Sequence, residues 1–496
     1  MGTVPGMATM RRVDLDDVDD EHGHDERPRR RRRLWVVAAL VAAVAAALGG
    51  AQLVVDARHR AYAVQFDGLP GAVWKLDDPA PRWPVQIYDG RANGARVRDT
   101  IVSAFVTEDG DVTISGVALR TGTARWTTHV QTPAEVVADF RRGEQDSFSR
   151  GVECRTSARR GEPEALAVCV VGVEPPGVHS ESGRRALLVA VDDAGRVRTQ
   201  RVVPDAFWTT RGTHVVLATI PRPGHRDTIT VTEQTVEGQA VWSRTLGAGD
   251  AVDASEAAEE IFGTDLTTDG TWTAVHTGTR AFVLDENGEV VGDVATGGGT
   301  GASLVAGGAL WLWDYEDERP GRLVLPGAPG LALPAHSGDA QPVTVAVDDG
   351  SVPGLLPVQV GHSVFAIDAR TGDRLWSTST PADVAGAVIL DGVVYVSAGD
   401  RVIAADARTG QERWTTRLPL GAGTLTTDGR RLVVASQGVT LLDIDDGTVV
   451  RQLDAAALTP PQLEVAEDVV VYCRYGVLVM QVTTDDAPGT DLWVIS

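Results

Sequence analysis

Two patterns of apolar and polar positions divide the chain. From Leu34 to Val55 the sequence runs for 22 residues without a charged side chain, whereas past Asp56 apolar and polar residues alternate in short runs. Alternation with a period of two predicts half-buried β-strands, and the Asp-Gly and Gly-Asp dipeptides between the runs predict tight turns. Short helical patterns occur at 133–142 and 254–261. The sequence therefore predicts an all-β domain over residues 56–496, preceded by one apolar helix.

The apolar segment 34–55 is long enough to cross a bilayer. A helix of that length spans about 33 Å, against roughly 30 Å of hydrocarbon. Arg29–Arg33 precede it directly, so the positive-inside rule places the amino terminus in the cytoplasm and residues 56–496 outside the cell membrane. A cleaved signal peptide with its apolar core at Leu34–Leu48 is the alternative. Because the apolar run continues through Leu53–Val55, the pattern favours an uncleaved, single-pass anchor.

Residues 1–33 read as a disordered cytoplasmic tail. They hold eight arginines and eight acidic residues, and the acidic block precedes the run Arg29–Arg33. A segment of this composition buries too little apolar surface to offset the entropy of folding. We therefore expect no folded module ahead of the membrane segment.

The β region is built from repeats. Residues 388–414 form one complete unit, in which VIL, VVYVSA, RVIAADA and QERW are four strands separated by tight turns. The pattern A-x-D-A-R-T-G-x-x-x-W occurs at 366–376 and at 404–414, and the related GVALRTGTARW occupies 116–126. Four-stranded units that recur about every 36–45 residues predict a β-propeller.

The repeat has a local physical explanation. An Asp accepts backbone N–H groups and caps the turn, and a Gly supplies the left-handed conformation that closes the hairpin between the third and fourth strands. Four residues later, a Trp projects from the outer strand as an apolar plug between neighbouring blades. The predicted docking tryptophans are Trp126, Trp242, Trp376, Trp414 and Trp493, and the predicted turn residues are Gly122, Gly372, Gly410, Asp368 and Asp406.

On these residues the chain resembles the PQQ-like (quinoprotein alcohol dehydrogenase-like) β-propellers, whose repeats carry an A-x-D-x-x-T-G-x-x-x-W tryptophan-docking motif. The motif is strong at 366–376 and 404–414, good at 116–126 and degraded elsewhere. The resemblance covers roughly residues 60–496 and implies seven or eight four-stranded blades, of which we favour eight. With its arginine-rich composition, the chain looks like a membrane-anchored, actinobacterial-type envelope protein of this family.

The resemblance also implies a cofactor site that the chain does not clearly supply. Family members that oxidise alcohols hold pyrroloquinoline quinone and a Ca²⁺ bound through Glu and Asn, use a catalytic Asp, and often have a disulfide between adjacent cysteines. This chain has only two Asn, Asn93 and Asn287, and it has neither adjacent cysteines nor a C-x-x-C-H haem motif. PQQ and calcium therefore remain possible but unsupported, and we predict no catalytic, cofactor-binding or metal-binding residue.

The net charge narrows the class of partner, and the cysteines bear on the covalent structure. The chain has 45 Lys and Arg against 68 Asp and Glu, a net charge of -23, which argues against a nucleic-acid partner. Cys154 and Cys169 flank a hairpin-like insertion, and we predict a disulfide between them, which is chemically allowed outside the membrane. Cys473 is left over and reads as a small buried residue.

The sequence thus favours a non-catalytic, membrane-anchored, extracytoplasmic propeller that acts as a binding or assembly scaffold in the cell envelope. Its expected partners are envelope proteins, which would contact the polar inserts 133–163 and 314–342 at one rim, and its small-molecule ligand is unknown. One alternative is a PQQ-dependent dehydrogenase with an atypical active site. The other is an envelope sensor or receptor, which would have to signal by recruiting another protein because the cytoplasmic tail is short.

Overall fold

The described residues belong to the second of two compact units, Met1–Ala61 and Tyr62–Ser496. The computed structural model describes residues 72–73, 76, 79–85, 94–107, 110–137, 152–157, 165–172, 185–204, 206–219, 228–247, 265–268, 270–277, 280–296, 300–305, 308–314, 322–324, 340–459, 468–474, 477–483 and 490–495. The predicted tail 1–33, the apolar segment 34–55 and the helical stretch 254–261 lie outside this set. Within it, no helix has the length and apolar character needed to cross a membrane.

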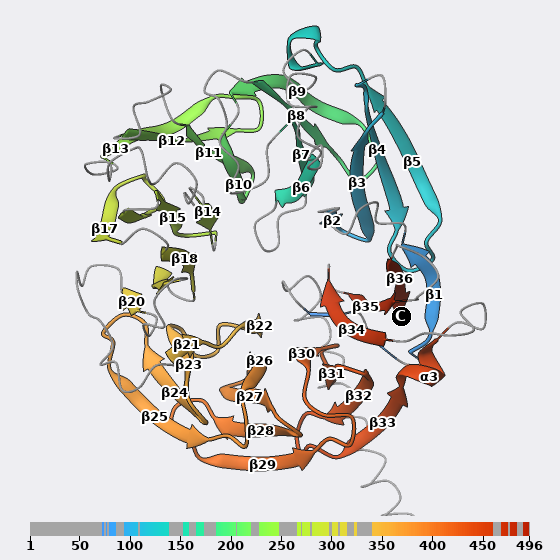
Figure 1. Ribbon diagram of the computed structural model, residues 1–496, viewed down its shortest axis with the longest axis vertical. Coiled ribbons are helices and arrows are strands. Elements are labelled where there is room, and N and C mark those ends of the chain that lie inside the picture. The colour runs from blue at the N-terminus through green and yellow to red at the C-terminus, as the bar shows by residue number, and fades with distance from the viewer. Residues whose placement is uncertain are drawn as a thin grey trace, which may run out of the picture. The chain divides into compact units, whose positions relative to one another are not determined.

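Nine β-sheets make up the described part of the chain, and we number them as blades in chain order (Figure 1). Blade 1 contains β2 (Ala95–Val97), β3 (Thr100–Val106), β4 (Val112–Ala118) and β5 (Ala124–Val130). Blade 2 contains β6 (Val152–Ser157), β7 (Leu166–Val171), β8 (Arg185–Val191) and β9 (Val197–Pro204). Blade 3 contains β10 (Phe207–Arg211), β11 (His214–Thr219), β12 (Thr228–Thr235) and β13 (Ala240–Gly247).

Blades 4 to 6 form the middle third of the ring in chain order. Blade 4 contains β14 (Asp265–Thr268), β15 (Thr273–His276), β16 (Arg280–Leu284) and β17 (Val290–Ala295). Blade 5 has three described strands, β18 (Thr300–Leu304), β19 (Leu310–Asp314) and β20 (Arg322–Val324). Blade 6 contains β21 (Ala340–Pro342), β23 (Leu355–Val360), β24 (Ser363–Asp368) and β25 (Arg374–Ser379).

Blades 7 to 9 complete the set. Blade 7 contains β22 (Val345–Asp348), β26 (Val384–Leu390), β27 (Val393–Ala398), β28 (Arg401–Asp406) and β29 (Glu412–Arg417). Blade 8 contains β30 (Thr424–Thr427), β31 (Arg431–Ala435), β32 (Gly438–Asp443) and β33 (Val449–Asp454), followed by the short helix α3 (Ala455–Leu458). Blade 9 contains β34 (Asp468–Arg474), β35 (Val477–Thr483), β36 (Thr490–Ile495) and the amino-terminal strand β1 (Pro81–Val85).

The hydrophobic core consists of clusters that each join two successive blades. Val97 and Ile114 of blade 1 pack with Leu187 and Val189 of blade 2, and the same arrangement continues from blade to blade along the chain. A last cluster joins blade 9 back to blade 1 through side chains that include Ile101, Leu119, Val479 and Val494. Because the clusters return to their starting blade, the sheets form a closed ring, the β-propeller that the repeats predict.

The preference for eight blades was wrong, because the structure has nine. The count was difficult to make from the sequence because the pattern is degraded in several blades, since the fourth strands of blades 2, 4 and 8 contain no tryptophan. In blade 5 the pattern is missing, and β19 and β20 fall in the irregular stretch around WLWDYEDERPGRLVLP. The hydrophobic contacts of Trp311 and Leu323 with Leu356 and Val358 of blade 6 nevertheless identify it as a separate blade.

The amino-terminal strand closes the ring. β1 pairs antiparallel with β36, with Pro84 opposite Trp493 and Val85 opposite Leu492. It is therefore the outermost strand of blade 9, whose three other strands come from the carboxyl end of the chain. Residues that precede β1 also pack against the sheets: Val73 and Leu76 are buried against blades 8 and 9, and the Val73 N–H donates to the Thr427 carbonyl at 2.9 Å.

Blade 7 contains a strand that the repeat does not predict. β22 lies between β21 and β23 in sequence but pairs in parallel with β26, the first strand of the next repeat unit. Carboxylate and hydroxyl oxygens of this insertion cap the following turn, because Asp349 Oδ2 accepts the Asp391 N–H at 2.8 Å and Ser351 Oγ accepts the Gly392 N–H at 2.9 Å. Blade 7 is consequently five-stranded.

Candidate functional site

The junction between blades 1 and 2 shows how a docking tryptophan works. Trp126 on β5 packs against Gly195 in the turn between β8 and β9, where a Cβ atom would overlap the indole ring. Its Nε1–H donates to the Asp193 carbonyl at 2.9 Å, and the Thr128 hydroxyl donates to the Gly195 carbonyl at 2.6 Å. The tryptophan thus supplies both apolar contact and a hydrogen bond to the next blade.

The same joint recurs between blades 6 and 7. Trp376 is 7% exposed, and its Nε1–H donates to the Ala407 carbonyl at 2.7 Å. A Cβ on Gly410 would lie 2.8 Å from the indole Cδ2 atom. Gly410 is therefore required twice, by its φ of 71° and by the indole ring that covers it.

Between blades 7 and 8, the packing on the glycine and the hydrogen bond to the turn carbonyl come from two different aromatic side chains. Trp414 packs on Gly447, and Thr416 donates to the Gly447 carbonyl at 2.6 Å. The hydrogen bond to the residue after the turn Asp comes from Tyr395, whose hydroxyl lies 3.3 Å from the Ile444 carbonyl oxygen. Tyr395 and Trp414 also contact each other, with ring centroids 5.8 Å apart.

Arginine takes over the donor role at two further junctions. Between blades 2 and 3, Arg201 lies over Gly238 and its Nε–H donates to the Val236 carbonyl at 2.9 Å. Between blades 3 and 4, Trp242 packs on Gly288, but the Glu286 carbonyl accepts from Arg211 Nη2 at 2.8 Å. At five junctions, then, a carbonyl in the turn of one blade accepts a hydrogen bond from the preceding blade.

Arg211 belongs to a buried ionic cluster in blade 3. Arg211 and Glu233 are 2% and 1% exposed and form an ion pair, and His214 Nδ1 contacts the other carboxylate oxygen of Glu233. The Arg211 guanidinium lies 5.8 Å from the Trp242 ring centroid and also donates to the Asp285 carbonyl at 3.2 Å. This cluster connects the interior of blade 3 to the turn of blade 4.

The turn residues that the motif predicts occupy the hairpins between the third and fourth strands. Gly122, Gly372 and Gly410 all have positive φ, and each donates its N–H to the carbonyl four residues earlier. Asp368 accepts the Arg370 N–H at 2.9 Å, and Asp406 accepts the Thr409 N–H at 3.1 Å. Side-chain hydrogen bonds from Arg370 to Asp368, and from Arg413 to Asp406, lower the pKa of each carboxyl.

Trp493 differs from the other predicted docking residues. It lies on β36, the third strand of blade 9, and β1 covers that strand on its outer side. The side chain is half-buried and packs with the cluster between blades 8 and 9. The outermost strand of blade 9, where the docking tryptophan was expected, is β1 from the amino-terminal side of the chain. The repeat pattern around Trp493 does not indicate this.

Arg201, Arg211 and Tyr395 are joint residues that the sequence analysis did not identify. They act at the same kind of carbonyl as the tryptophans but come from different strand positions, so no common motif marks them. The glycines on which these side chains pack can be recognised in the sequence, because each lies three or four positions after the first residue of its turn. That set is Gly195, Gly238, Gly288, Gly410 and Gly447.

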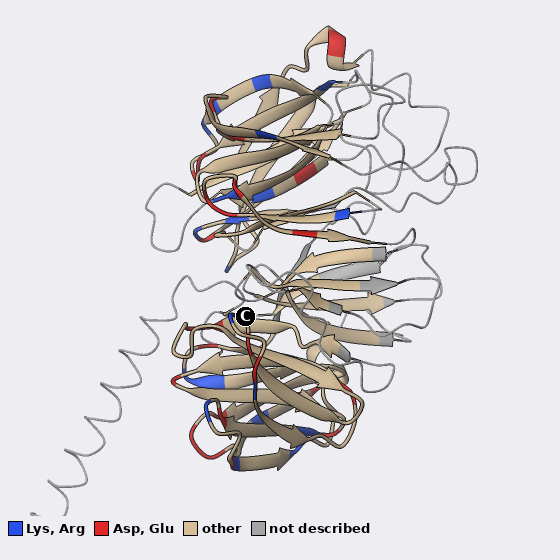
Figure 2. Ribbon diagram, turned by 90° about the vertical axis from the view of Figure 1, so that its left-hand side faces the viewer, with Lys and Arg blue, Asp and Glu red and all other residues tan. Residues whose placement is uncertain are grey.

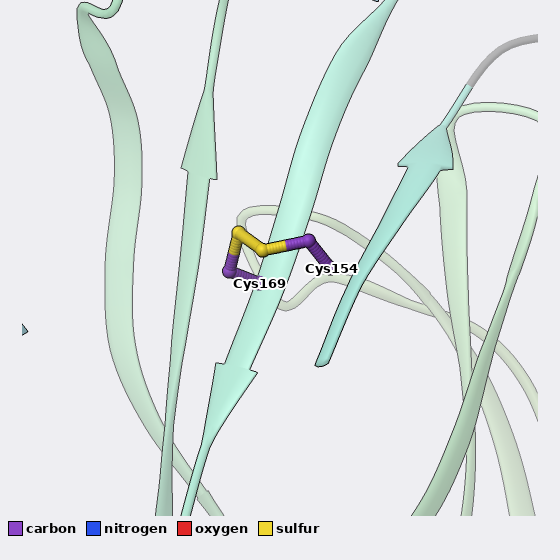
Figure 3. Close-up of a disulfide and its surroundings, with 2 residues drawn as sticks. All are labelled: Cys154 and Cys169. Carbon is purple, nitrogen blue, oxygen red and sulfur yellow. A yellow bond between two sulfur atoms is a disulfide. The ribbon is translucent and has the colours of Figure 1, made fainter. Parts of the chain in front are cut away.

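Cys154 and Cys169 are joined by a disulfide within blade 2 (Figure 3). They lie directly opposite each other on β6 and β7. Both are buried, at 3% and 0% exposure, in the cluster that joins blades 1 and 2. Cys473 on β34 is partly buried and takes no part in this disulfide.

Two observations on the described residues concern the quinone and calcium site that the resemblance implies. No group of three His, Cys, Asp or Glu side chains in the described ranges is arranged to hold a metal ion. Asn287 lies in the turn between β16 and β17, where its N–H donates to Asp285 Oδ1 at 2.8 Å, and Asn93 lies outside the described residues. We therefore derive no step through that cofactor.

Comparison with known proteins finds a family match over part of the chain and solved structures of low similarity. No protein of curated function matches the sequence. BamB from Moraxella catarrhalis is similar in structure with a TM-score of 0.39, 15% identity, and coverage of 84% of this chain and 100% of that one. Saccharomyces cerevisiae Sqt1 has a TM-score of 0.40 and 8% identity, with coverage of 84% of this chain and 99% of that one. Apo AztD from Citrobacter koseri has a TM-score of 0.35 and 11% identity, with coverage of 69% of this chain and 91% of that one.

At these identities and TM-scores, none of the three likenesses supports an inference about function. The family match is confined to the carboxyl-terminal part of the chain, from the end of β23 in blade 6 to β36 in blade 9. Residues 359–493 match the family described as outer membrane protein assembly factor BamB.

Proposed function

We propose that the protein is a non-catalytic, membrane-anchored, extracytoplasmic β-propeller that binds other proteins and holds them for assembly in the cell envelope. The observation that carries the proposal is the match of residues 359–493 to a family described as an assembly factor. The blade joints support it physically, because glycine-seated side chains and their hydrogen bonds to the next blade favour a rigid ring that presents loops in fixed positions.

Two features of the chain support the extracytoplasmic location. Disulfides persist in oxidising compartments and are rare in the cytosol, and Cys154 and Cys169 are bonded within a buried cluster. Arg29–Arg33 ahead of the 22-residue apolar segment would retain the amino terminus in the cytoplasm.

The acidic net charge of -23 favours partners with basic surfaces.

The location can be tested through the cysteines. Full-length protein made in cells is trapped with a thiol-alkylating reagent under denaturing conditions, and the number of alkylated cysteines is read by mass spectrometry. We expect alkylation at Cys473 alone, whereas a control chain that lacks residues 1–55 should be alkylated at all three cysteines. Alkylation of Cys154 and Cys169 in the full-length protein would exclude an oxidising compartment.

Partner binding needs a separate experiment. The full-length chain is crosslinked in intact cells, and each enriched envelope protein is then mixed in purified form with the purified full-length chain. We expect at least one stoichiometric complex by light scattering after size exclusion, weakened by salt if basic surfaces are involved. If no enriched protein rebinds at low ionic strength, the scaffold proposal fails.

A further inference from the structure

A charged pocket opens among the turns of three successive blades. Its volume is about 420 Å³, within the range of small-molecule sites. The charged residues come from the turn between β2 and β3, the segment from the end of β8 into β9, and the turn between β12 and β13, and Ala165 and Leu166 at the start of β7 also line the pocket. Its charged lining consists of Arg98, Asp192, Asp193, Arg196, Arg198 and Glu237.

Arg98 enters the pocket from a strained backbone. Its φ is 55°, and Asp391 is the other non-glycine residue with positive φ in the described ranges. Left-handed backbone at a residue with a side chain is disfavoured and is often found at binding sites. Here the Arg98 side chain crosses from blade 1 to blade 2, where Nη1 donates to Asp193 Oδ2 at 2.7 Å.

A single carboxylate orients the other two arginines. Arg196 and Arg198 donate through Nε to the same Asp192 oxygen, Oδ2, at 2.8 and 2.9 Å. The Asp192 side chain is only 7% exposed, and Oδ1 accepts the N–H groups of Ala194 and Arg196, each at 3.0 Å. Burial opposes ionisation of Asp192, but these hydrogen bonds outweigh it and lower the pKa of the carboxyl.

The trio of Asp192, Arg196 and Arg198 carries a net positive charge although the lining as a whole is neutral. Three arginines and three carboxylates line the pocket, but Arg196 and Arg198 share the single carboxylate of Asp192, so one positive charge is not neutralised within this trio. Because both arginines use Nε for Asp192, their Nη groups remain available, and their side chains are 69% and 50% exposed. A guanidinium fixed at Nε presents its Nη fork in a defined orientation, the geometry that matches a carboxylate.

We propose that this pocket binds a carboxylate-bearing small molecule through the Nη groups of Arg196 and Arg198, in a space that Arg98 also lines. A carboxylate suits it better than a phosphate, because Asp193 and Glu237 line the same space and would repel a dianion more strongly than a monoanion. Figure 2 shows basic and acidic residues concentrated in the turns and at strand ends, where such mixed-charge sites can form. This site goes beyond the proposed scaffold function and requires no protein partner.

The test uses purified full-length protein in detergent and isothermal titration at low ionic strength. Succinamate and L-glutamate, each with one net negative charge, are the probes, with succinamide as the uncharged analogue and inorganic phosphate at mildly alkaline pH as the dianion. We expect a saturable site with a dissociation constant of 5 mM or tighter for at least one carboxylate, weaker binding of phosphate, and no binding of succinamide. Absence of saturation by both carboxylates, or equal binding of succinamide, overturns the proposal.

Variants test the assignment to these arginines. The double substitution Arg196→Gln/Arg198→Gln should lower carboxylate affinity at least tenfold. The control is Arg370→Gln, which removes an arginine of similar exposure paired with Asp368 in the corresponding turn of blade 6. Because all three side chains are exposed, circular dichroism should show folded protein in both variants. An equal loss of affinity in the control would mean that the protein binds anions only through diffuse charge.

Discussion

At the scale of single residues, the blades are held at their spacing by glycines that receive a large side chain from the preceding blade. Trp126 on Gly195 and Trp376 on Gly410 combine this contact with a hydrogen bond from Nε1 to a backbone carbonyl. Neither partner works alone, since the indole needs a position without a Cβ and the turn needs positive φ. The docking residue and its glycine therefore form one structural unit divided between two blades.

Two glycines in blade 7 allow the effect of positive φ to be measured separately from the effect of the contact with the indole. Gly410→Ala should destabilise the protein in two ways, since alanine disfavours the φ of 71° and its Cβ would lie 2.8 Å from the Trp376 ring. Gly392→Ala is the matched control, with a φ of 72° and nothing within 4 Å of its Cβ. We expect about 1–2 kcal/mol from the backbone in both variants and a further 1–3 kcal/mol from overpacking in Gly410→Ala. Equal shifts of the unfolding temperature in the two variants would show that the indole contact does not determine the junction.

The turn carboxylates predict a pH dependence. Hydrogen bonds from Arg370 and Arg413 lower the folded-state pKa of Asp368 and Asp406 below the usual value of about 3.9. A lowered pKa stabilises the fold fully above the unfolded-state value, and this stabilisation is lost as pH falls through the folded-state value. Stability measured by thermal unfolding should therefore lose this contribution below about pH 4.

The double variant Asp368→Asn/Asp406→Asn isolates that contribution from the general effect of protonating an acidic protein. The difference in unfolding temperature between the original chain and the variant should be constant from pH 7 to 5 and shrink below pH 4. A difference that stays constant down to pH 3 would mean that the two carboxylates titrate alike in the folded and unfolded chain.

At the scale of elements, the same junction is built from different side chains in different blades. The repeat pattern predicted the turn and the tryptophan at 366–376 and 404–414, because both are local features of one hairpin. It could not predict that Arg201, Arg211 or Tyr395 would donate to the turn carbonyl of the next blade, because packing of separate repeat units brings them there. For the same reason the parallel pairing of β22 with β26 was not visible in the alternation of either segment.

The buried ion pair of blade 3 should be one of the most sensitive points of the ring. Glu233→Gln leaves Arg211 buried beside a neutral partner, and removing one member of a buried pair typically costs 3–5 kcal/mol. The control Glu289→Gln removes the carboxylate of an exposed pair with Arg244 at the same junction, where the expected cost is about 0.2–1 kcal/mol. Urea unfolding followed by tryptophan fluorescence measures both. Comparable midpoints for the two variants would argue that water reaches Arg211.

At the scale of the whole molecule, two features of the ring depend on segments far apart in the chain. The repeats indicated a propeller, but not its ninth blade, because the turn-and-tryptophan pattern is degraded in several blades and is missing from blade 5. They also did not indicate that Pro81–Val85 would complete the sheet of Thr490–Ile495. A closing strand from the other end of the chain leaves no periodic signal of its own, and β1 contains two prolines that weaken its strand pattern.

Ring closure can be measured with truncations at the amino terminus. Removal of residues 1–61 leaves the compact unit Tyr62–Ser496 whole, so its unfolding temperature should match that of the full chain. Removal of 1–77 also takes away Val73 and Leu76, which are 5% and 1% exposed, and should destabilise blades 8 and 9. Removal of 1–87 deletes β1 as well and exposes the edge of β36, a pairing site for other chains. We expect the unfolding temperature to fall stepwise over the last two truncations, and the shortest chain to self-associate in light scattering. A shortest chain that stays monomeric and as stable as the 1–61 truncation would show that β1 is not needed to close the ring.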